Sequence, residues 1–299
     1  MTDNKTKVLL VGDNPFHGIS HLSQEQARTR ENSSNPEYAA NLVATALEND
    51  ATGFMFSVSE TTLSILQALH EKEENKRPAL YALVPYAFEY VRVATQIGIP
   101  GLAKRFVKQI TFSGNVRAIG TGLKGVVRMD PAALLKTYLS YEISRIKSAA
   151  GKQANIESVM LHEVITDMSL ALNLDWLIRS FVDFMQKQDI KPGFNTRNFA
   201  YLVKKLDEWD ISSRDVVIAA PFNKVGFQMD PSKTECEKAL ASLDGPNVIA
   251  ISILAAGYLK PAEAVEYIQS LPNILGVAAG VSKERHARET FKLFKNGLE

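Results

Sequence analysis

Short apolar runs alternate with longer segments of helical periodicity along almost the whole chain. Most runs are short and apolar on both faces, which is typical of a strand buried in a parallel sheet, and Lys191–Asn195 is the weak one. Because helical segments separate the runs, the order predicts strand–helix units placed side by side. The predicted strands are Lys7–Gly12, Gly53–Ser57, Ala79–Val84, Ser158–His162, Lys191–Asn195, Val216–Ala220, Val248–Leu254 and Ile274–Ala279.

Eight such units predict a (β/α)₈ TIM barrel, a fold that uses about 250 residues as one domain. We therefore expect residues 1–299 to form a single domain. The rival fold is a doubly wound open sheet, which normally has a glycine-rich turn after its first strand. The turn from Gly12 to His17 contains no further glycine, which favours the barrel. The predicted helices are Pro36–Glu48, Thr61–Lys72, Pro131–Lys147, Asn173–Gln188, Phe199–Trp209, Ser232–Leu243, Pro261–Leu271 and Lys283–Lys295.

One segment is longer than the minimal unit. Residues 87–129 lie between the third strand and its expected barrel helix. Insertions of this length are often functional lids or binding loops. A decorated loop that packs on the top of the barrel is the alternative interpretation.

Composition excludes several classes of protein. The formal net charge is +1, so no global field would attract nucleic acid or an anionic membrane. Cys236 is the only cysteine, which excludes an intrachain disulfide. Met1–Lys7 is polar, and no apolar run reaches the roughly 18 residues that a membrane span needs. We expect a cytoplasmic protein with a small-molecule substrate as partner; the sequence sets no oligomeric state.

Many polar residues follow the predicted strands, and strand C-termini converge on one site in a barrel of this type. Such a set suits acid–base chemistry, because burial and neighbouring charges can bring one pKa near neutrality. We expect catalytic roles for Asp13, Tyr86, His162 and Glu163, and substrate contacts for His17, Asn195 and Arg197.

His162 is the first candidate among them, because it ends an apolar strand and is followed by Glu163. A neutral imidazole at this position could orient or polarise a carbonyl. The alternative is a core histidine that bonds a neighbouring backbone carbonyl.

A divalent metal is a second possibility. Its ligands would come from histidine and carboxylate groups, which zinc and similar ions accept. His17 lies four residues after Asp13 and four before His21, but the surrounding residues indicate a loop, so helical spacing is not assumed. The alternative places both histidines in loop hydrogen bonds. The candidate ligands are Asp13, His17, His21, His162 and Glu163.

An anion site is predicted after the seventh and eighth strands, where many barrels hold phosphate. Gly257 and the turn 280–282 could present backbone N–H groups, with Lys283 and Arg285 nearby. In the alternative interpretation, Ser282 only caps the last helix and the basic residues are solvated.

From the fourth strand onward the chain resembles the aldo-keto reductases, barrel enzymes that use NADP. Ile156–His162 looks like the family's fourth strand, which ends in a catalytic histidine, and Ala219–Asn223 looks like the end of its sixth. Ala250–Leu259 closely matches the seventh strand and its loop, and Gly280–Glu289 matches the exit of the eighth strand and the final helix.

The resemblance implies a role for each matching residue. His162 would be catalytic, and Phe222 would stack on the nicotinamide of NADP. The loop after strand seven would lie against the cofactor phosphate, and the turn after strand eight would grip the adenosine end. The implied cofactor-binding residues are Phe222, Asn223, Ser252, Leu254, Gly257, Gly280, Ser282, Lys283 and Arg285.

The chain also departs from the family. The family's catalytic aspartate and tyrosine follow strand two, where Phe54–Glu60 contains neither residue type. Its lysine ends strand three, where Leu83–Tyr86 contains no lysine. Only the histidine of the catalytic four is present, so Tyr86 or Glu163 would have to replace the tyrosine as proton donor.

Three functions are therefore compared. The first is a divergent aldo-keto reductase-like oxidoreductase that acts on a small carbonyl or hydroxyl compound with NADP(H). The second is a non-redox lyase, isomerase or hydrolase, with or without a metal, that acts on a phosphorylated or otherwise anionic small molecule. The third is a non-catalytic ligand-binding barrel, against which the density of polar strand ends argues.

Overall fold

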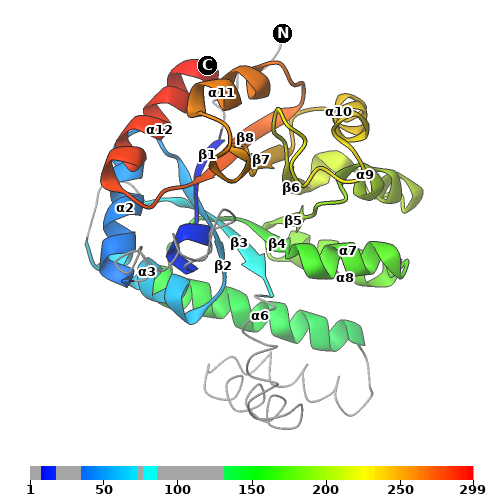
Figure 1. Ribbon diagram of the computed structural model, residues 1–299. Helices are drawn as coiled ribbons and strands as arrows, with labels where there is room; N and C mark the ends of the chain where they lie inside the picture. Colours follow the sequence, from blue (N-terminus) through cyan, green and yellow to red (C-terminus); the bar gives the residue numbers. More distant parts are fainter. Residues whose placement is uncertain (1–7, 18–34, 73–76, 86–130, 299) are drawn as a thin grey trace.

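The structure is a computed structural model, and it describes residues 8–17, 35–72, 77–85 and 131–298. Eight parallel strands form a closed barrel in chain order, with β8 paired to β1 (Figure 1). The strands are β1 Val8–Gly12, β2 Gly53–Ser57, β3 Ala79–Val84, β4 Ile156–Leu161, β5 Lys191–Asn195, β6 Val217–Pro221, β7 Val248–Ile251 and β8 Ile274–Gly280.

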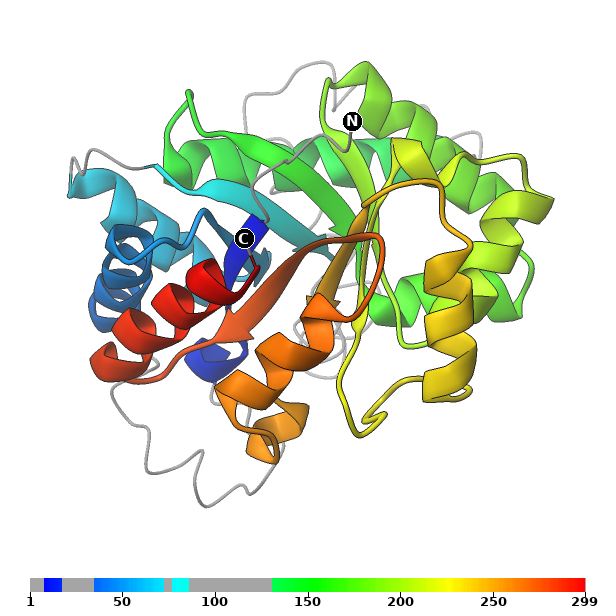
Figure 2. The same ribbon diagram turned by 90° about the horizontal axis from the view of Figure 1, so that it is seen from above.

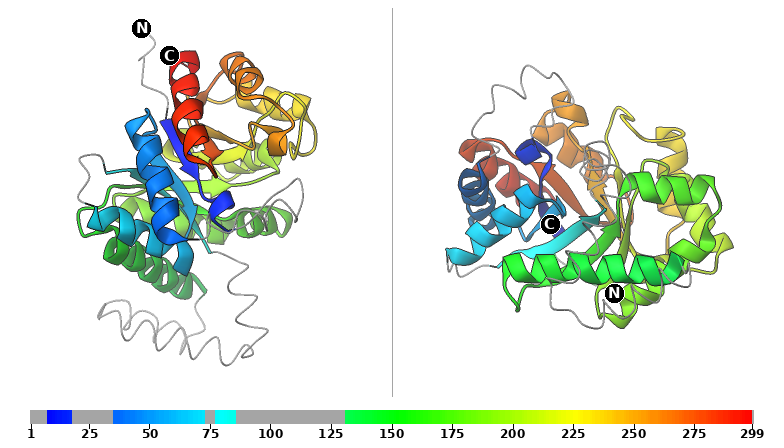
Figure 3. Two further views of the ribbon diagram at one scale, coloured as in Figure 1. Left: turned by 60° about the vertical axis from the view of Figure 1, so that its left-hand side comes forward. Right: turned by 90° about the horizontal axis from the view of Figure 1, so that it is seen from below.

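Helices surround this barrel, as the view from above shows (Figure 2). α12 and α2 lie side by side next to the β8–β1 seam (Figure 3). The helices are α2 Pro36–Glu48, α3 Glu60–Glu71, α6 Pro131–Ala150, α7 Glu163–Ala171, α8 Asp175–Lys187, α9 Phe199–Glu208, α10 Lys233–Ala241, α11 Pro261–Gln269 and α12 Glu284–Leu298, with short 3-10 turns η1 Asn14–His17, η3 Ser213–Asp215 and η4 Ala255–Gly257.

The predicted (β/α)₈ barrel is confirmed, and most elements begin and end close to their predicted residues. β7 is shorter than predicted, because Ser252 has a left-handed backbone with φ of 52°, which an extended strand does not contain. The predicted helix Asn173–Gln188 is preceded by a further helix, α7, which the sequence analysis did not expect. Asn173, with φ of 52°, separates the two helices.

Because successive side chains of a strand point to opposite faces of the sheet, the apolar residues form two layers. One set fills the barrel interior and includes Leu10, Met160 and Ile249. The other packs between the strands and the surrounding helices and includes Phe54 and Phe194. A side chain near a strand end therefore faces either the barrel axis or the helices, according to its place in the alternation.

No helix in the described part of the chain is both long enough and apolar enough to cross a bilayer.

Candidate active site

His162 directly follows β4 and caps the N-terminus of α7. Its backbone N–H donates to the Val84 carbonyl at 2.8 Å, which fixes the residue at the end of β3 and β4. Its Nδ1 accepts a hydrogen bond from the Val164 N–H at 3.3 Å. Because Nδ1 is the acceptor, the neutral ring carries its proton on Nε2. His162 is therefore a hydrogen-bond donor held at the C-terminal end of the barrel.

Asp13 and His17 form a second polar group at this end of the barrel. The Asp13 carboxylate accepts from the Ser57 N–H at the end of β2, at 2.6 Å, and pairs with His17 Nε2 at 3.1 Å. The single turn η1 brings His17 back toward Asp13. Both side chains are almost completely buried, with 7% of each exposed. Asp13 thus links β1 to β2 and fixes the orientation of the His17 ring.

Glu163 and Arg197 form an ion pair between α7 and the loop after β5. Arg197 Nε and Nη2 donate to the two carboxylate oxygens of Glu163 at 3.1 and 2.9 Å. This two-bond geometry is the strong form of an arginine–carboxylate contact. The guanidinium remains 41% exposed, so one side of it can still meet a ligand. Glu163 itself is engaged and is a weaker candidate for a base.

The surroundings of His162 keep its imidazole neutral. Burial lowers the pKa of His162, while the charges of Glu163 and Asp13 oppose this shift. Arg197 adds to the lowering of the pKa, and Asp167 opposes it. The N-terminus of α7 also disfavours an imidazolium, because the helix dipole is positive there. Charged residues after β1, β4 and β5 therefore all act on the same imidazole.

Two asparagines predicted at the site hold backbone loops in place. Asn195 is buried and donates through Nδ2 to the Ala219 carbonyl of β6 at 3.2 Å. Asn223 is fully buried and bonds both the N–H and the carbonyl of Phe227, at 2.7 and 2.8 Å. The amide of Asn223 therefore closes the loop after β6 and leaves little capacity for a ligand.

Phe222 does not face the mouth of the barrel. It follows Ile218 and Ala220 in the alternation, and these residues pack toward the helices. Its ring is fully buried and meets Phe199 of α9 edge to face, with centroids 5.1 Å apart. In this conformation the ring is not open to a nicotinamide, unlike the role that the resemblance implies.

The turn after β7 uses most of its backbone donors internally. The N–H groups of Gly257 and Leu259 both donate to the Leu254 carbonyl, at 2.8 and 3.1 Å. Ser252 Oγ lies 3.4 Å from Gln228 Oε1, so its hydroxyl faces the loop after β6. The N–H of Gly257, predicted as an anion donor, is therefore already occupied.

The segment after β8 leads into α12 and carries two exposed basic residues, Lys283 and Arg285. Gly280 is exposed, and a Cβ there would lie 2.8 Å from Pro15, so the loop after β1 approaches closely. The Lys283 carbonyl accepts from Ala287 N–H, so Lys283 rather than the predicted Ser282 occupies the cap position of α12. Lys283 is exposed and has no side-chain partner among the described residues. Arg285 is also exposed and lies 3.7 Å from Glu289.

Two candidates lie outside the described residues, namely Tyr86 and His21, together with the predicted insertion 87–129. Within the described ranges no three His, Cys, Asp or Glu side chains are grouped to hold a metal ion. Asp13 is bonded to His17, and Glu163 is bonded to Arg197. The divalent-metal hypothesis therefore gains no support from this part of the chain.

Comparison with known proteins places this geometry in a structural class. No protein-family model matches the chain, and no curated protein sequence matches it significantly. Two solved structures of a proposed aldo-keto reductase from Pseudomonas aeruginosa align with TM-scores of 0.59 and 0.60, over 97% of this chain and 91% and 90% of theirs. The chain folds as an aldo-keto reductase-like barrel.

The similarity lies in the fold, because the identity to both Pseudomonas structures is 12%. The glycerol dehydrogenase of Gluconobacter oxydans also aligns, with a TM-score of 0.52 and 9% identity, over 96% of this chain and 86% of that one. An aldo-keto reductase-like barrel shared over these lengths does not by itself assign a reaction.

Sequence reasoning missed two polar residues of this barrel, Asp167 and Thr196. Thr196 is fully buried and donates its hydroxyl to the Asp167 carboxylate, which also accepts from the Arg197 N–H at 3.4 Å. Burial raises the pKa of Asp167, and the bond from Thr196 opposes this shift. Asp167 lies four residues after Glu163, so a predicted helix from Glu163 would have placed both on one face.

We expect Thr196→Val to destabilise the protein by about 2 kcal/mol, because the half-buried Asp167 carboxylate loses its hydroxyl donor and the Asn198 N–H loses its acceptor. Urea unfolding measures the change in free energy. Thr166→Val is the matched control, since Thr166 is equally buried but donates to the neutral Leu161 carbonyl at 3.1 Å. Equal losses in the two variants would contradict a special role for the Asp167 bond.

Proposed function

We propose that the protein is a divergent aldo-keto reductase-like oxidoreductase that acts on a small carbonyl or hydroxyl compound with NADP(H). The observation that carries this proposal is the state of His162 at the end of β4. Its bond to Val164 fixes the proton of the neutral ring on Nε2, and burial lowers its pKa. A neutral imidazole donor at a strand end is suited to polarising a substrate carbonyl.

The groups around His162 suit the rest of the chemistry. A bound nicotinamide supplies or accepts hydride at the substrate carbon. The substrate oxygen would accept the Nε2–H hydrogen bond of His162, which stabilises charge that develops on it. Proton exchange requires a second group, and the described strand ends offer the imidazole of His17, oriented by Asp13. Arg197, held by Glu163, would orient a polar or anionic part of the substrate.

The residues after β8 fit the phosphate part of such a cofactor, whereas Phe222 does not fit its ring in this conformation. Lys283 is exposed without a side-chain partner in the described part of the chain, and it lies at the N-terminus of α12, where the backbone of a helix favours an anion. Phe222 remains buried against Phe199. We therefore assign the phosphate contact to Lys283, Arg285 and the turn 280–282, and assign no stacking role to Phe222.

A titration with NADPH and NADH, followed by cofactor fluorescence, tests the proposal. We expect micromolar binding, with NADPH weakened roughly tenfold by Lys283→Ala and less by Arg285→Ala, because each removes a charged contact to phosphate. Lys292→Ala is the matched control, since Lys292 is an exposed lysine two turns further along the same helix. Absence of binding by either cofactor, or equal weakening by all three variants, would contradict the proposed cofactor site.

A second candidate, acid–base chemistry without a redox cofactor, is favoured by one observation. Asp13 pairs with His17, and the charge of Asp13 also acts on His162. This arrangement suits a lyase, isomerase or hydrolase acting on an anionic small molecule, with Arg197 as its anion contact. If neither cofactor binds, turnover of phosphorylated metabolites that depends on His17 would support this candidate instead.

A further inference from the structure

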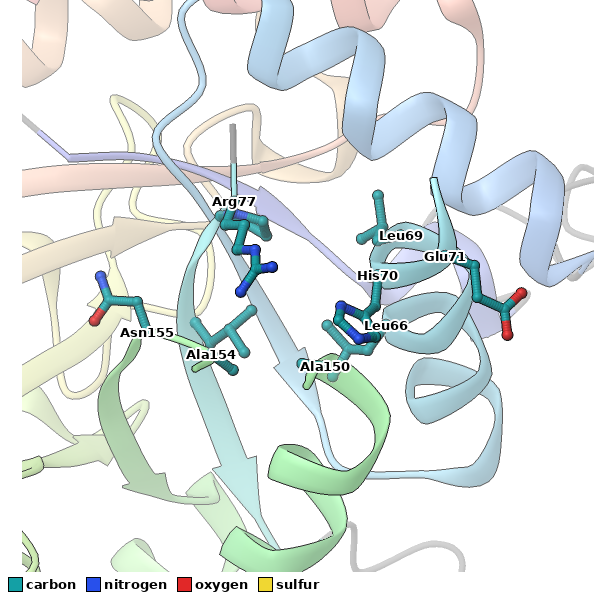
Figure 4. Close-up of a pocket in the computed structure, with 10 residues that line it drawn as sticks. Leu66, Leu69, His70, Glu71, Arg77, Ala150, Ala154 and Asn155 are labelled. Atoms are coloured by element: carbon teal, nitrogen blue, oxygen red, sulfur yellow. The ribbon is translucent and has the colours of Figure 1, made fainter. Parts of the chain in front are cut away.

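A pocket of about 470 Å³ lies at the N-terminal ends of β3 and β4, and Figure 4 shows the residues that line it. It is formed by the last turn of α3, the residues before β3, the end of α6 and the residues before β4. Because these segments meet at the N-terminal ends of the strands, the pocket is separate from the candidate active site. Its volume is in the range of small-molecule sites.

The pocket combines an apolar floor with a rim formed by Arg77 and His70. Buried Leu66 and Leu80 lie beneath this floor, and the partly exposed Leu69 and Ala150 contribute its accessible apolar surface. Arg77 and His70 approach from opposite sides, Arg77 from the start of β3 and His70 from α3 (Figure 4). A ligand with an apolar body and one polar end would satisfy both parts.

The two rim side chains, Arg77 and His70, are both exposed. Among the described residues, neither the Arg77 guanidinium nor the His70 imidazole makes a side-chain hydrogen bond or ion pair. Glu71 also lines the pocket, but its carboxylate points away and accepts from Gln67 Nε2 at 3.0 Å (Figure 4). Among the described residues that line the pocket, the one carboxylate is therefore engaged elsewhere and does not pair with Arg77.

Gly151 holds the His70 ring in position. Its backbone has φ of 88°, and a Cβ built on it would lie 2.7 Å from Cε1 of His70 and 3.0 Å from Nε2. The glycine therefore lies directly against the imidazole, at a distance that no larger residue permits. Packing of this kind limits the positions of the ring before any ligand arrives, which favours binding.

We propose that this pocket binds a small organic anion, a carboxylate or phosphate ester with an apolar body. Its anionic end would bond Arg77 and His70, and its apolar part would cover Leu66, Leu80 and Ala150. The site is independent of the oxidoreductase proposal, since no residue is shared between the two.

Isothermal titration with benzoate and with phenyl phosphate tests this site. We expect both probes to bind at millimolar concentration or better, and benzyl alcohol, which has the apolar body without the charge, to bind at least tenfold more weakly. Inorganic phosphate should also bind at least tenfold more weakly than phenyl phosphate, because it covers none of the apolar floor. Equal binding of the charged and neutral probes would overturn the proposal.

Variants locate the binding. Arg77→Gln should weaken benzoate about tenfold, and Ala150→Leu, which fills the floor, should weaken it at least as much. Arg179→Gln is the control, since Arg179 is an exposed arginine on α8 that pairs with Asp175. Lys283→Ala should leave benzoate binding unchanged, which separates this pocket from the proposed cofactor site. Binding that survives both Arg77→Gln and Ala150→Leu would overturn the assignment.

Discussion

His162→Asn is expected to lower carbonyl turnover by about 10²- to 10⁴-fold while leaving the fold stable. The reason lies in the two functions that one ring combines. Nδ1 caps α7 through the Val164 N–H, and Nε2 is the donor left for a substrate. Asparagine is a strong N-cap residue, so it keeps the first function and removes the second. Steady-state reduction of small aldehydes and ketones with NADPH measures the loss.

Two further variants separate capping from catalysis. His162→Ala removes both functions and should additionally lose about 1 kcal/mol of stability. Ser232→Ala removes a cap at α10, where Ser232 Oγ accepts from the Glu235 N–H at 3.2 Å, without touching the strand ends that carry the site. It should therefore destabilise the protein and leave turnover unchanged. An asparagine variant that retains turnover within about tenfold would show that His162 is not catalytic.

The pH dependence follows from the direction of the His162 shift. Because burial lowers its pKa, the neutral donor persists through neutral pH, and turnover should fall only as acid protonates the ring. The native state also resists this proton more than the unfolded chain does. The stability that the neutral His162 ring contributes is therefore fully present above the unfolded pKa of about 6.5, and it decreases as the pH falls below that value. His162→Asn should lose less stability than the wild type over that acid range.

The strands and most helices were predictable because a buried face requires apolar residues at regular positions in the sequence. β2 and β3 coincide with their predicted runs, since each run is apolar on both faces, and the weaker run Lys191–Asn195 also coincides with β5. α7 left no such trace, because a histidine caps it and it follows β4 without an intervening loop. Asp167 and Thr196 were missed for the same reason, since only α7 brings Asp167 to the loop after β5.

The candidate site was predictable only in its location. His162, Asp13, His17, Glu163 and Arg197 come together because strand C-termini meet at one end of a barrel. The direction of a side chain needs the register of the sheet, and Phe222 shows this, since its place in the alternation turns it toward α9. Whether a backbone donor is free, as for Gly257, depends on the turn that forms.

Gly276→Ala is expected to destabilise the barrel by about 3 kcal/mol or more, because it acts where the sheet closes. Gly276 of β8 is the register partner of Val8 in β1. A Cβ there would lie 2.0 Å from the Val8 carbonyl oxygen and 2.7 Å from its carbon. The register between β7 and β8 shifts next to this point, so Leu275 has no register partner in β7.

The obstacle is backbone, so no rotamer change can relieve it, and the strands must separate or shift register. Gly12→Ala is the matched control in the same strand pair, since its Cβ would meet the Ala279 carbonyl carbon at an ordinary 3.6 Å. We expect that variant to change stability by less than about 1 kcal/mol. Urea unfolding of both compares them directly. A Gly276→Ala protein as stable as the control would mean that β1 and β8 are not packed as closely as this register requires.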